Sequence, residues 1–461
     1  MGVEVEHKPR KPHVLVFPFP GQGHINPMLQ FAKRLLSKGV RAALVSTVFL
    51  ASSSFSGSSI SFDHHTISDG FDEGGIYQAA DAEAYLSTFC SVGSKSLAAL
   101  IQRLGETGHP VDALVYDSLM PWALDVAKQL GVPAAAFFTQ SCAVNSVYYH
   151  VWKGDLQLPL PPTRVYLPAL PPLRVSELPS FVAIYGLYPA WLDALVNQFS
   201  NVDGAEWVFL NHFYELEPEA MDWMSKHWNV MTVGPTIPSM YLDKRLQNNK
   251  DYGLNLFDPN ASACMSWLSG KPKGSVVYVS FGSIASLGTK QMAEIGCALK
   301  RRNGHFLWVV RETEKSKLPH NYIEETSDQG LVVTWCPQLE VLSHESIGCF
   351  LTHCGFNSVL EALSLGVPML AMPQWTDQAT NAKYIEDVWR VGIRACCDKE
   401  GIVRRETIEH GIKELLMEVG EKGREIRKNS IKWKNLASKA VDAGGKSDKN
   451  IDEFIAKVQS N

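Results

Sequence analysis

The sequence predicts an α/β protein in which two doubly wound parallel sheets form separate domains. Short apolar runs rich in β-branched and aromatic residues alternate with amphipathic helical patterns, as is typical of right-handed βαβ crossovers. This alternation occurs twice, before and after a polar, irregular segment at 236–263. A chain of 461 residues is long enough for two or three domains, each with its own core. We therefore expect two similar domains with a cleft between them.

In the first half, apolar runs predict strands that are covered on both faces. These runs lie at 13–19, 41–47, 112–117, 133–139 and 206–211. A helix is predicted after the first run, with Asn26 as its cap, Pro27 at its first position and Gly39 at its end. A second helix is predicted between Pro121 and Gly131. The proline-rich stretch 158–180 predicts an extended loop over a site, and the histidine pair at 64–65 predicts a surface loop.

The second half repeats the pattern. Strands are predicted at 275–281, 306–310, 331–335, 348–353 and 368–373, and helices at 289–302, 357–365, 377–389 and 405–419. The charged segment 424–459 predicts an amphipathic helix. We divide the chain into an N-terminal domain (1–240), a linker (241–262), a C-terminal domain (263–440) and a C-terminal helix (441–461) that packs back on the first domain.

Composition and charge exclude several classes of protein. A net charge of -5 with no basic stripe argues against a nucleic-acid partner. No run of 18 apolar residues occurs, so no membrane span is expected. Nine irregularly spaced cysteines and a polar N-terminal segment favour free thiols in a reducing compartment, so we expect a cytoplasmic protein. A monomer is also expected.

Two polar residues at predicted strand ends suggest acid–base chemistry. His24 follows the first strand and Asp117 ends the third. Parallel strands of one sheet bring such residues to one edge, where ligands bind. A carboxylate beside an imidazole fixes its tautomer and stabilises the imidazolium. His24 is therefore a candidate general base, and Asp117 is the residue that orients it.

The same loop, Gly21 to Asn26, partly matches a dinucleotide-binding fingerprint, but its third glycine is replaced by Asn26. The second predicted strand also lacks a terminal Asp or Glu that could hold a ribose hydroxyl. Binding of NAD or FAD is thus disfavoured. A serine hydrolase is disfavoured too, because no G-x-S-x-G elbow occurs. No metal site is predicted.

The stretch 352–370 predicts a binding site for a nucleotide diphosphate. A helix begins near Asn357 and Ser358, where free N–H groups suit a phosphate. Glu361 lies one turn later on the same face, where it can accept from ribose hydroxyls. The other candidates also lie at strand ends or beside them: His353, Gly355, Ser283 for a second phosphate contact, and Trp335 as an aromatic face for a base.

The segment Trp335 to Gln378, WCPQLEVLSHESIGCFLTHCGFNSVLEALSLGVPMLAMPQWTDQ, closely resembles the donor-binding box of plant UDP-dependent glycosyltransferases. FPFPGQGHINPMLQFAKRL, YDSLMPWALDVA, FFTQSC and YVSFGS also resemble segments of this family. The chain is most similar to the branch that acts on small carboxylates, terpenoids and steroids. The resemblance implies a GT-B fold, in which two Rossmann-like domains face each other, and an inverting, metal-independent transfer, usually of glucose from UDP-glucose.

The resemblance also implies roles for individual residues. His24 matches the family's base and Asp117 its orienting aspartate. The remaining matches concern the donor: Trp335 and Cys336 on uracil, Gln338 and Glu361 on ribose, Ser283, His353, Asn357 and Ser358 on the diphosphate, and Thr139, Asp377 and Gln378 near the sugar. Gly23 and Gly355 would let the donor approach the backbone. The family usually has tryptophan where Phe356 stands, but the backbone N–H of that position is kept.

We therefore expect a glucosyltransferase that modifies a hydroxyl or carboxyl of a hydrophobic plant small molecule, with a terpenoid or steroid preferred. Small phenolics and carboxylic acids are the alternative acceptors. Loops around 75–90, 118–122, 139–150 and 180–200 are expected to line the acceptor pocket, with apolar and aromatic residues such as Tyr85, Met120, Phe138, Tyr148 and Trp191. A nucleotide-sugar-binding protein without catalysis is the rival from another class.

Overall fold

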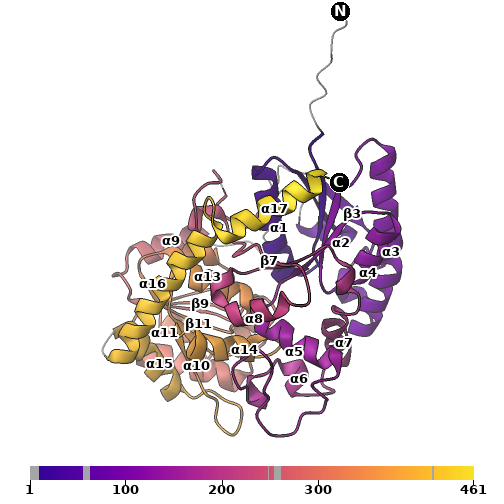
Figure 1. The fold of residues 1–461 in the computed structure, drawn as a ribbon. Coiled ribbons are helices and arrows are strands. Elements are labelled where there is room, and N and C mark those ends of the chain that lie inside the picture. The colour runs from indigo at the N-terminus through magenta and orange to yellow at the C-terminus, as the bar shows by residue number, and fades with distance from the viewer. Residues whose placement is uncertain (1–9, 55–62, 248, 254–260, 418–419, 461) are drawn as a thin grey trace, which may run out of the picture.

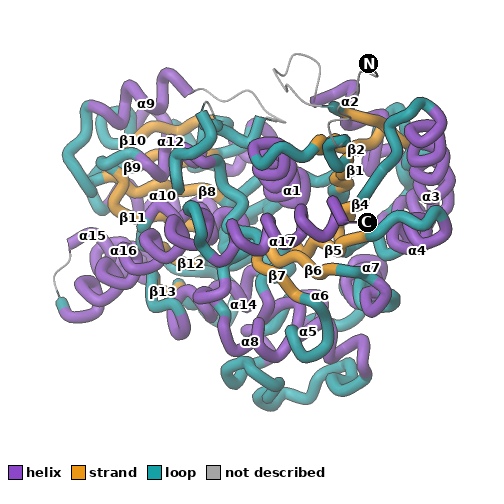
Figure 2. The backbone as a smooth tube through the Cα atoms, turned by 45° about the horizontal axis from the view of Figure 1, so that its top comes forward, coloured by secondary structure: helices purple, strands orange, loops and turns teal. Residues whose placement is uncertain are grey.

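The computed structural model describes residues 10–54, 63–247, 249–253, 261–417 and 420–460. Two parallel sheets organise this part of the chain, and helices pack on both faces of each sheet (Figures 1 and 2). The predicted α/β class with two doubly wound domains is thereby confirmed. None of the helices described is both long and apolar enough to cross a membrane.

The N-terminal sheet has seven parallel strands in the order β3-β2-β1-β4-β5-β6-β7. They are β1 (His13–Phe17), β2 (Arg41–Thr47), β3 (His64–Ile67), β4 (Ala113–Asp117), β5 (Ala134–Phe138), β6 (Trp207–Leu210) and β7 (Val230–Thr232). Its helices are α1 (Gln22–Ser37), α2 (Val48–Ser54), α3 (Ala82–Glu106), α4 (Trp122–Gln129), α5 (Cys142–Lys153), α6 (Ser180–Ala183), α7 (Pro189–Asn197) and α8 (Pro218–Met224). Every residue of β1, β4 and β5 is buried, as expected for strands covered on both faces.

The C-terminal sheet has six parallel strands in the order β10-β9-β8-β11-β12-β13. They are β8 (Val276–Ser280), β9 (Phe306–Val309), β10 (Gly330–Val333), β11 (Ile347–Thr352), β12 (Met369–Ala371) and β13 (Gly392–Arg394). The helices around it are α9 (Ala261–Ser269), α10 (Thr289–Arg301), α11 (Tyr322–Glu325), α12 (Gln338–Ser343), α13 (Phe356–Leu365), α14 (Gln378–Lys383), α15 (Arg405–Met417) and α16 (Glu421–Val441). In each sheet the strand order reverses between two neighbouring strands, β1 and β4 in the first and β8 and β11 in the second. Ligands of such sheets bind at the carboxyl ends of the strands at this point.

The chain ends in a helix that returns to the N-terminal domain. The segment 424–459, predicted as one helix, is two helices, because α16 ends at Val441 and α17 (Lys446–Ser460) starts after Gly444 and Gly445. In Figure 1 these yellow helices run from one domain to the other. Phe454 of α17 packs edge-on against Trp207 and Phe209, with ring centroids 5.0 and 5.1 Å away.

Three further predictions of local structure were wrong. Asn26 is not a helix cap: α1 begins at Gln22, Gly21 is its N-cap, and Pro27 lies inside the helix. His64 and His65 belong to the edge strand β3 rather than to a loop. Three of the loops predicted around the acceptor pocket are partly helical. The range 75–90 includes the start of α3 at Ala82, capped by the carboxylate of Asp81, 139–150 includes most of α5, and 180–200 includes α6 and α7.

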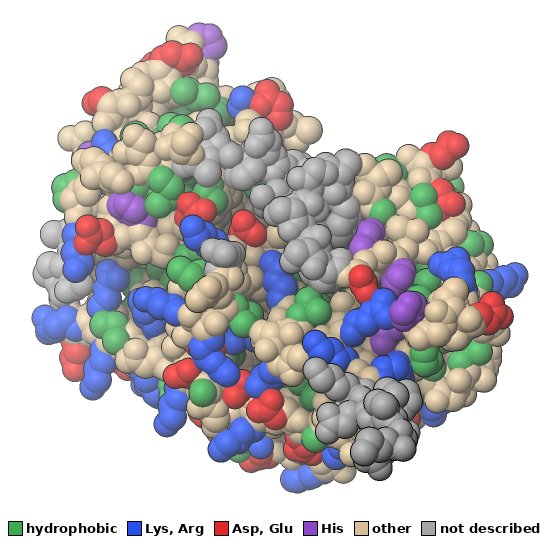
Figure 3. All heavy atoms as spheres, turned by 90° about the horizontal axis from the view of Figure 1, so that it is seen from above, with side chains coloured by type: hydrophobic (Ala, Val, Ile, Leu, Met, Phe, Trp, Pro, Cys, Tyr) green, Lys and Arg blue, Asp and Glu red, His purple; other side chains and the backbone are tan. Residues whose placement is uncertain are grey.

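The linker predicted at 241–262 includes residues 248 and 254–260, which lie outside the described part of the chain. Its described portion contacts both domains: Lys33 of α1 donates to the carbonyl of Tyr252, and the Tyr252 hydroxyl donates to Glu361 of α13. On the face shown in Figure 3, Lys and Arg side chains are interspersed with Asp and Glu side chains.

Candidate active site

The adjacent strands β1, β4 and β5 bring three predicted residues together at their carboxyl ends. His24 lies in the first turn of α1, directly after β1, while Asp117 ends β4 and Thr139 follows β5. The Nδ1 atom of His24 is 2.7 Å from Oδ2 of Asp117 and 3.2 Å from the hydroxyl of Thr139. The topology of the sheet therefore creates a His–Asp pair from residues 93 positions apart in the chain.

The carboxylate of Asp117 is held between the ring of His24 and the backbone of Leu119. It is fully buried, and its Oδ1 atom accepts from the backbone N–H of Leu119 at 3.1 Å. With Nδ1–H of His24 donating to Oδ2, the Nε2 atom carries the free lone pair. Burial disfavours the imidazolium, but the charges of Asp117 and Asp377 and the hydrogen bond to Asp117 outweigh this effect and raise the pKa of His24. This arrangement is that of a general base with a fixed tautomer.

A small cavity of about 10 Å³ lies beside His24. Its lining residues are His24, Ser118, Leu119, Thr139, Gln140, Asn145, Leu195 and Gln198. Of the aromatic and apolar residues expected in an acceptor pocket, Tyr85, Met120, Phe138 and Tyr148 are buried in the core of the domain, and Trp191 is partly exposed. Apart from His24, the lining residues fall in the ranges predicted for the acceptor pocket, but the polar character of most of them was not predicted.

In the C-terminal domain, α13 begins after β11 and a short loop. Gly355 is its N-cap, and the first intrahelical bond runs from the N–H of Val359 to the carbonyl of Gly355. The amides of Phe356, Asn357 and Ser358 thus have no intrahelical acceptor, as is usual in a first turn. This helix start offers N–H groups and a partial positive charge to a phosphate.

His353 lies between this helix start and the loop after β8. A Cβ atom at Gly282 or Gly355 would come within 2.6 or 2.5 Å of the Nε2 atom of His353, so a larger residue at either position would displace this ring, and Gly282 also has a φ of +72°. Burial lowers the pKa of His353 to about 4, although a hydrogen bond to the backbone of Ser280 acts in the opposite direction. The ring is therefore neutral at pH 7 and can donate a hydrogen bond to a diphosphate without adding charge. Ser283 lies next to Gly282, half-buried, and its carbonyl accepts from Arg311.

The residues predicted to hold a ribose lie together around Glu361. Gln338 donates to the carboxylate of Glu361 at 2.7 Å and to the hydroxyl of Ser358 at 2.9 Å. The hydroxyl of Tyr252 donates to the other oxygen of Glu361 at 2.8 Å. Burial raises the pKa of Glu361 to about 7, although these hydrogen bonds lower it. Tyr252 was missed because nothing in a polar linker indicates that its side chain reaches α13.

Residues predicted to contact the base and the sugar flank this cluster. Trp335 follows β10 and is half-buried, while the Cys336 thiol points into the core against the hydroxyl of Tyr278, at 3.3 Å. Asp377 is buried and accepts from Asn381 at 2.7 Å, and burial raises its pKa to about 6 despite this bond. The side-chain carbonyl of Gln378 accepts from the N–H groups of Gln374 and Trp375, which fixes the loop before α14.

Hydrogen bonds join the two domains beside these residues. Ser180, at the end of the proline-rich segment, exchanges hydrogen bonds with Thr376, the neighbour of Asp377. Asn357 donates to the carbonyl of Gly23, the neighbour of His24, at 2.7 Å. The turn that carries His24 is therefore hydrogen-bonded to the start of the helix that is predicted to bind the donor.

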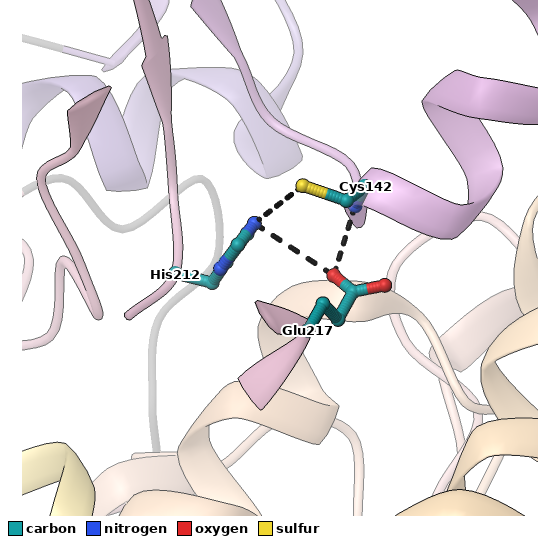
Figure 4. Close-up of side chains that lie close together, drawn as sticks. All are labelled: Cys142, His212 and Glu217. Carbon is teal, nitrogen blue, oxygen red and sulfur yellow. Dashed lines mark hydrogen bonds and ion pairs between the residues drawn. The ribbon is translucent and has the colours of Figure 1, made fainter. Parts of the chain in front are cut away.

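A second cluster of chemically capable side chains lies near the start of α5 (Figure 4). Cys142, His212 and Glu217 are buried, with Sγ of Cys142 3.0 Å from Nε2 of His212. The carboxylate of Glu217 accepts from the N–H groups of Cys142 and Ala143, at 2.8 and 2.9 Å. Because its two oxygens already bind the helix N-terminus, this cluster fits a helix cap better than a metal centre.

Comparison with known proteins agrees with this geometry. A family model described as "UDP-glucoronosyl and UDP-glucosyl transferase" matches residues 75–418. The chain is 48% identical to a flavonol 7-O-β-glucosyltransferase of Arabidopsis thaliana over 452 residues, 97% of this chain and 98% of the relative. It is 46% identical to a mogroside I-E synthase of Siraitia grosvenorii over 450 residues, again 97% and 98%.

Among solved structures, Os79 from O. sativa in complex with UDP matches 96% of this chain and 100% of its own, with a TM-score of 0.90 and 40% sequence identity. The same protein has also been solved with a trichothecene. One conclusion follows from the two Rossmann-like domains, from the family model that covers most of the chain, and from the near-complete coverage of these relatives. The chain belongs to the family of UDP-dependent glycosyltransferases.

Proposed function

We propose that this enzyme transfers glucose from UDP-glucose to a hydroxyl or carboxyl group of a hydrophobic small molecule, with His24 as the general base for a hydroxyl. The observation that carries the proposal is the hydrogen bond of 2.7 Å between His24 and the buried Asp117 at the edge of the cleft. Enzymes of the family use a UDP-sugar as co-substrate and transfer the sugar with inversion and without a metal ion.

The acceptor oxygen attacks the anomeric carbon from the face opposite UDP. His24 takes the proton of an attacking hydroxyl at Nε2, and Asp117 stabilises the imidazolium that forms. The bond from the anomeric carbon to the diphosphate oxygen breaks as the new glycosidic bond forms, which inverts the configuration. The first-turn N–H groups of α13 and the neutral ring of His353 stabilise the negative charge on the departing diphosphate.

The remaining donor contacts follow from the clusters described above. We assign Glu361 and Gln338 to ribose, Trp335 and the backbone of Cys336 to uracil, and Ser283 and Ser358 to the diphosphate. Thr139, Asp377 and Gln378 are assigned to the sugar. In this proposal the N-terminal domain, 1–240, binds the acceptor, and the C-terminal domain, 263–440, binds the donor.

A terpenoid or steroid is the acceptor class that we prefer. The relatives named above include a flavonol glucosyltransferase and a mogroside synthase, and Os79 has been solved with a trichothecene, so relatives take chemically different acceptors. Small phenolics and carboxylic acids are therefore the alternative.

The proposal is tested by incubating the purified enzyme with UDP-glucose and a panel of terpenoid, steroid, phenolic and carboxylic acceptors while UDP release is followed. We expect UDP release that depends on the acceptor, with the greatest kcat/KM for a terpenoid or steroid alcohol. UDP-glucose binding without release for any acceptor would instead identify a nucleotide-sugar-binding protein.

A further inference from the structure

The carbonyl of Gly23 lacks its ordinary partner in α1. In an α-helix this carbonyl accepts from the N–H of the residue four positions later. That residue is Pro27, which lies inside the helix and has no N–H. The carbonyl is therefore open to a donor from elsewhere, in the turn that carries His24.

The donor comes from the other domain. The side-chain amide of Asn357, in the first turn of α13, donates through Nδ2 to the Gly23 carbonyl at 2.7 Å. Its Oδ1 atom accepts from the amide of Asn211 at 3.4 Å, and the Oδ1 atom of Asn211 accepts from the N–H of Thr236 at 3.1 Å. A backbone carbonyl only accepts and a backbone N–H only donates, so the two ends of this chain of bonds fix the orientation of both amides.

This arrangement separates two roles within one helix start. The backbone N–H groups of residues 356–358 remain available to a diphosphate, while the side chain of Asn357 is committed to the acceptor domain. Gly23 directly precedes His24, and it is exposed. A shift of Gly23 would move the ring of the base relative to the anomeric carbon.

We propose that Asn357 is a positioning residue: its side-chain amide holds the turn that carries His24 against the donor-binding helix, and Pro27 keeps the Gly23 carbonyl open for it. The inference rests on the proposed function, in which His24 is the base and α13 binds the diphosphate. Family resemblance assigns Asn357 to the diphosphate, and this proposal leaves its backbone N–H to that task and gives its side chain to the Gly23 carbonyl.

Two substitutions remove the contact from opposite sides. Asn357→Ala deletes the donor, whereas Pro27→Ala supplies an N–H within α1 that competes for the Gly23 carbonyl and leaves every donor-binding group in place. We expect each variant to lower kcat for an alcohol acceptor by roughly 10-fold or more, because small misplacements of catalytic groups are costly. UDP affinity, measured by calorimetry, is expected to change less than about twofold, since the contact does not involve the nucleotide.

The double variant provides the sharpest comparison. If both substitutions break the same contact, Pro27→Ala adds no further loss to Asn357→Ala. Pro218→Ala is the matched control, because Pro218 occupies the start of α8, where a missing N–H deprives no carbonyl of its partner, and kcat should be unchanged. A large rise in the Kd of UDP for Asn357→Ala at normal kcat, or losses that multiply in the double variant, would overturn the proposal.

An independent measurement needs no turnover. The N–H groups of His24 and Ile25 both bond to the carbonyl of Gly21 at 2.9 Å, and their hydrogen exchange reports opening of this turn. Exchange should be faster in Asn357→Ala than in the wild type. Unchanged exchange contradicts the positioning role even if glucose transfer is confirmed, while faster exchange in a protein that transfers no glucose supports the contact and rejects the proposed function.

Discussion

The ring of His24 is influenced by carboxylates from both domains. Asp117 bonds it directly from the N-terminal sheet, and the charge of Asp377 acts on it from the C-terminal domain. Both charges raise the pKa of His24, while burial lowers it. A base with this environment is strong enough to accept a hydroxyl proton yet is protonated at slightly acid pH.

This environment predicts a pH dependence. A base must be neutral to act, so kcat/KM for an alcohol should rise with pH through a pKa above the ordinary value of histidine. Asp117→Asn removes the adjacent charge and leaves burial as the main influence, so the acid limb should move to lower pH while the plateau falls, because the tautomer is no longer fixed. Initial rates across pH for both proteins test this, and an unmoved limb would mean that another group titrates.

Position 356 departs from the family's usual tryptophan. Phe356 is 5% exposed, and its ring meets that of His212 edge-on, with centroids 6.4 Å apart. We therefore expect the side chain to act through packing and the backbone N–H to serve the donor. Phe356→Trp should retain transfer and change the KM of UDP-glucose modestly, as measured by steady-state kinetics. Complete loss of activity in a folded Phe356→Trp protein would contradict this view.

Among the secondary-structure elements, α5 depends on a buried carboxylate from outside the helix. Glu217 accepts from the N–H groups of Cys142 and Ala143. Glu217→Ala leaves both donors buried without a partner, which costs about 1–3 kcal/mol per unsatisfied group. A lowered unfolding midpoint is expected, whereas exposed Glu219 replaced by Ala should leave it nearly unchanged. Equal midpoints for both variants would show that Glu217 does not stabilise the start of α5.

Most strands could be predicted from the sequence because they are buried on both faces and read as continuous apolar runs. The start of α1 could not, because Pro27 and Asn26 favour a later start, while the actual cap is Gly21 without a side-chain bond. The edge strand β3 carries polar histidines and lacks an apolar run, so nothing distinguishes it from a loop. The helix α3 had a usable signal in the spacing of Tyr85, Phe89 and Leu97, which are all buried.

The candidate site was predictable to the extent that its residues follow strands or begin a helix. The pairing of His24 with Asp117 follows from strand order, which parallel topology makes predictable. Contacts from irregular segments were not predictable, since their reach depends on the path of the folded chain. The bonds of Tyr252 to Glu361 and of Asn211 to Asn357 belong to this class.

At the scale of the whole molecule, α17 joins the end of the chain to the N-terminal sheet. Phe454 is fully buried among aromatic rings of α1 and β6, and Asn450 donates to the carbonyl of Thr232 in β7. Phe454→Ala should destabilise the fold by about 3–5 kcal/mol through the cavity that it leaves. Thermal unfolding measures the effect, with Phe454→Leu as the milder control. An unchanged midpoint would mean that α17 contributes little to stability.

The central claim is that His24 removes a proton from the acceptor across the interdomain cleft. Its most direct test compares His24→Ala with the wild type on two acceptors that share a skeleton, one an alcohol and one a carboxylic acid. A carboxylate is already ionised near pH 7 and has little need of a base. We predict a loss of roughly 10²–10⁴-fold in kcat for the alcohol and a clearly smaller loss for the carboxylate. Alcohol transfer that survives in His24→Ala at the wild-type rate would contradict the account.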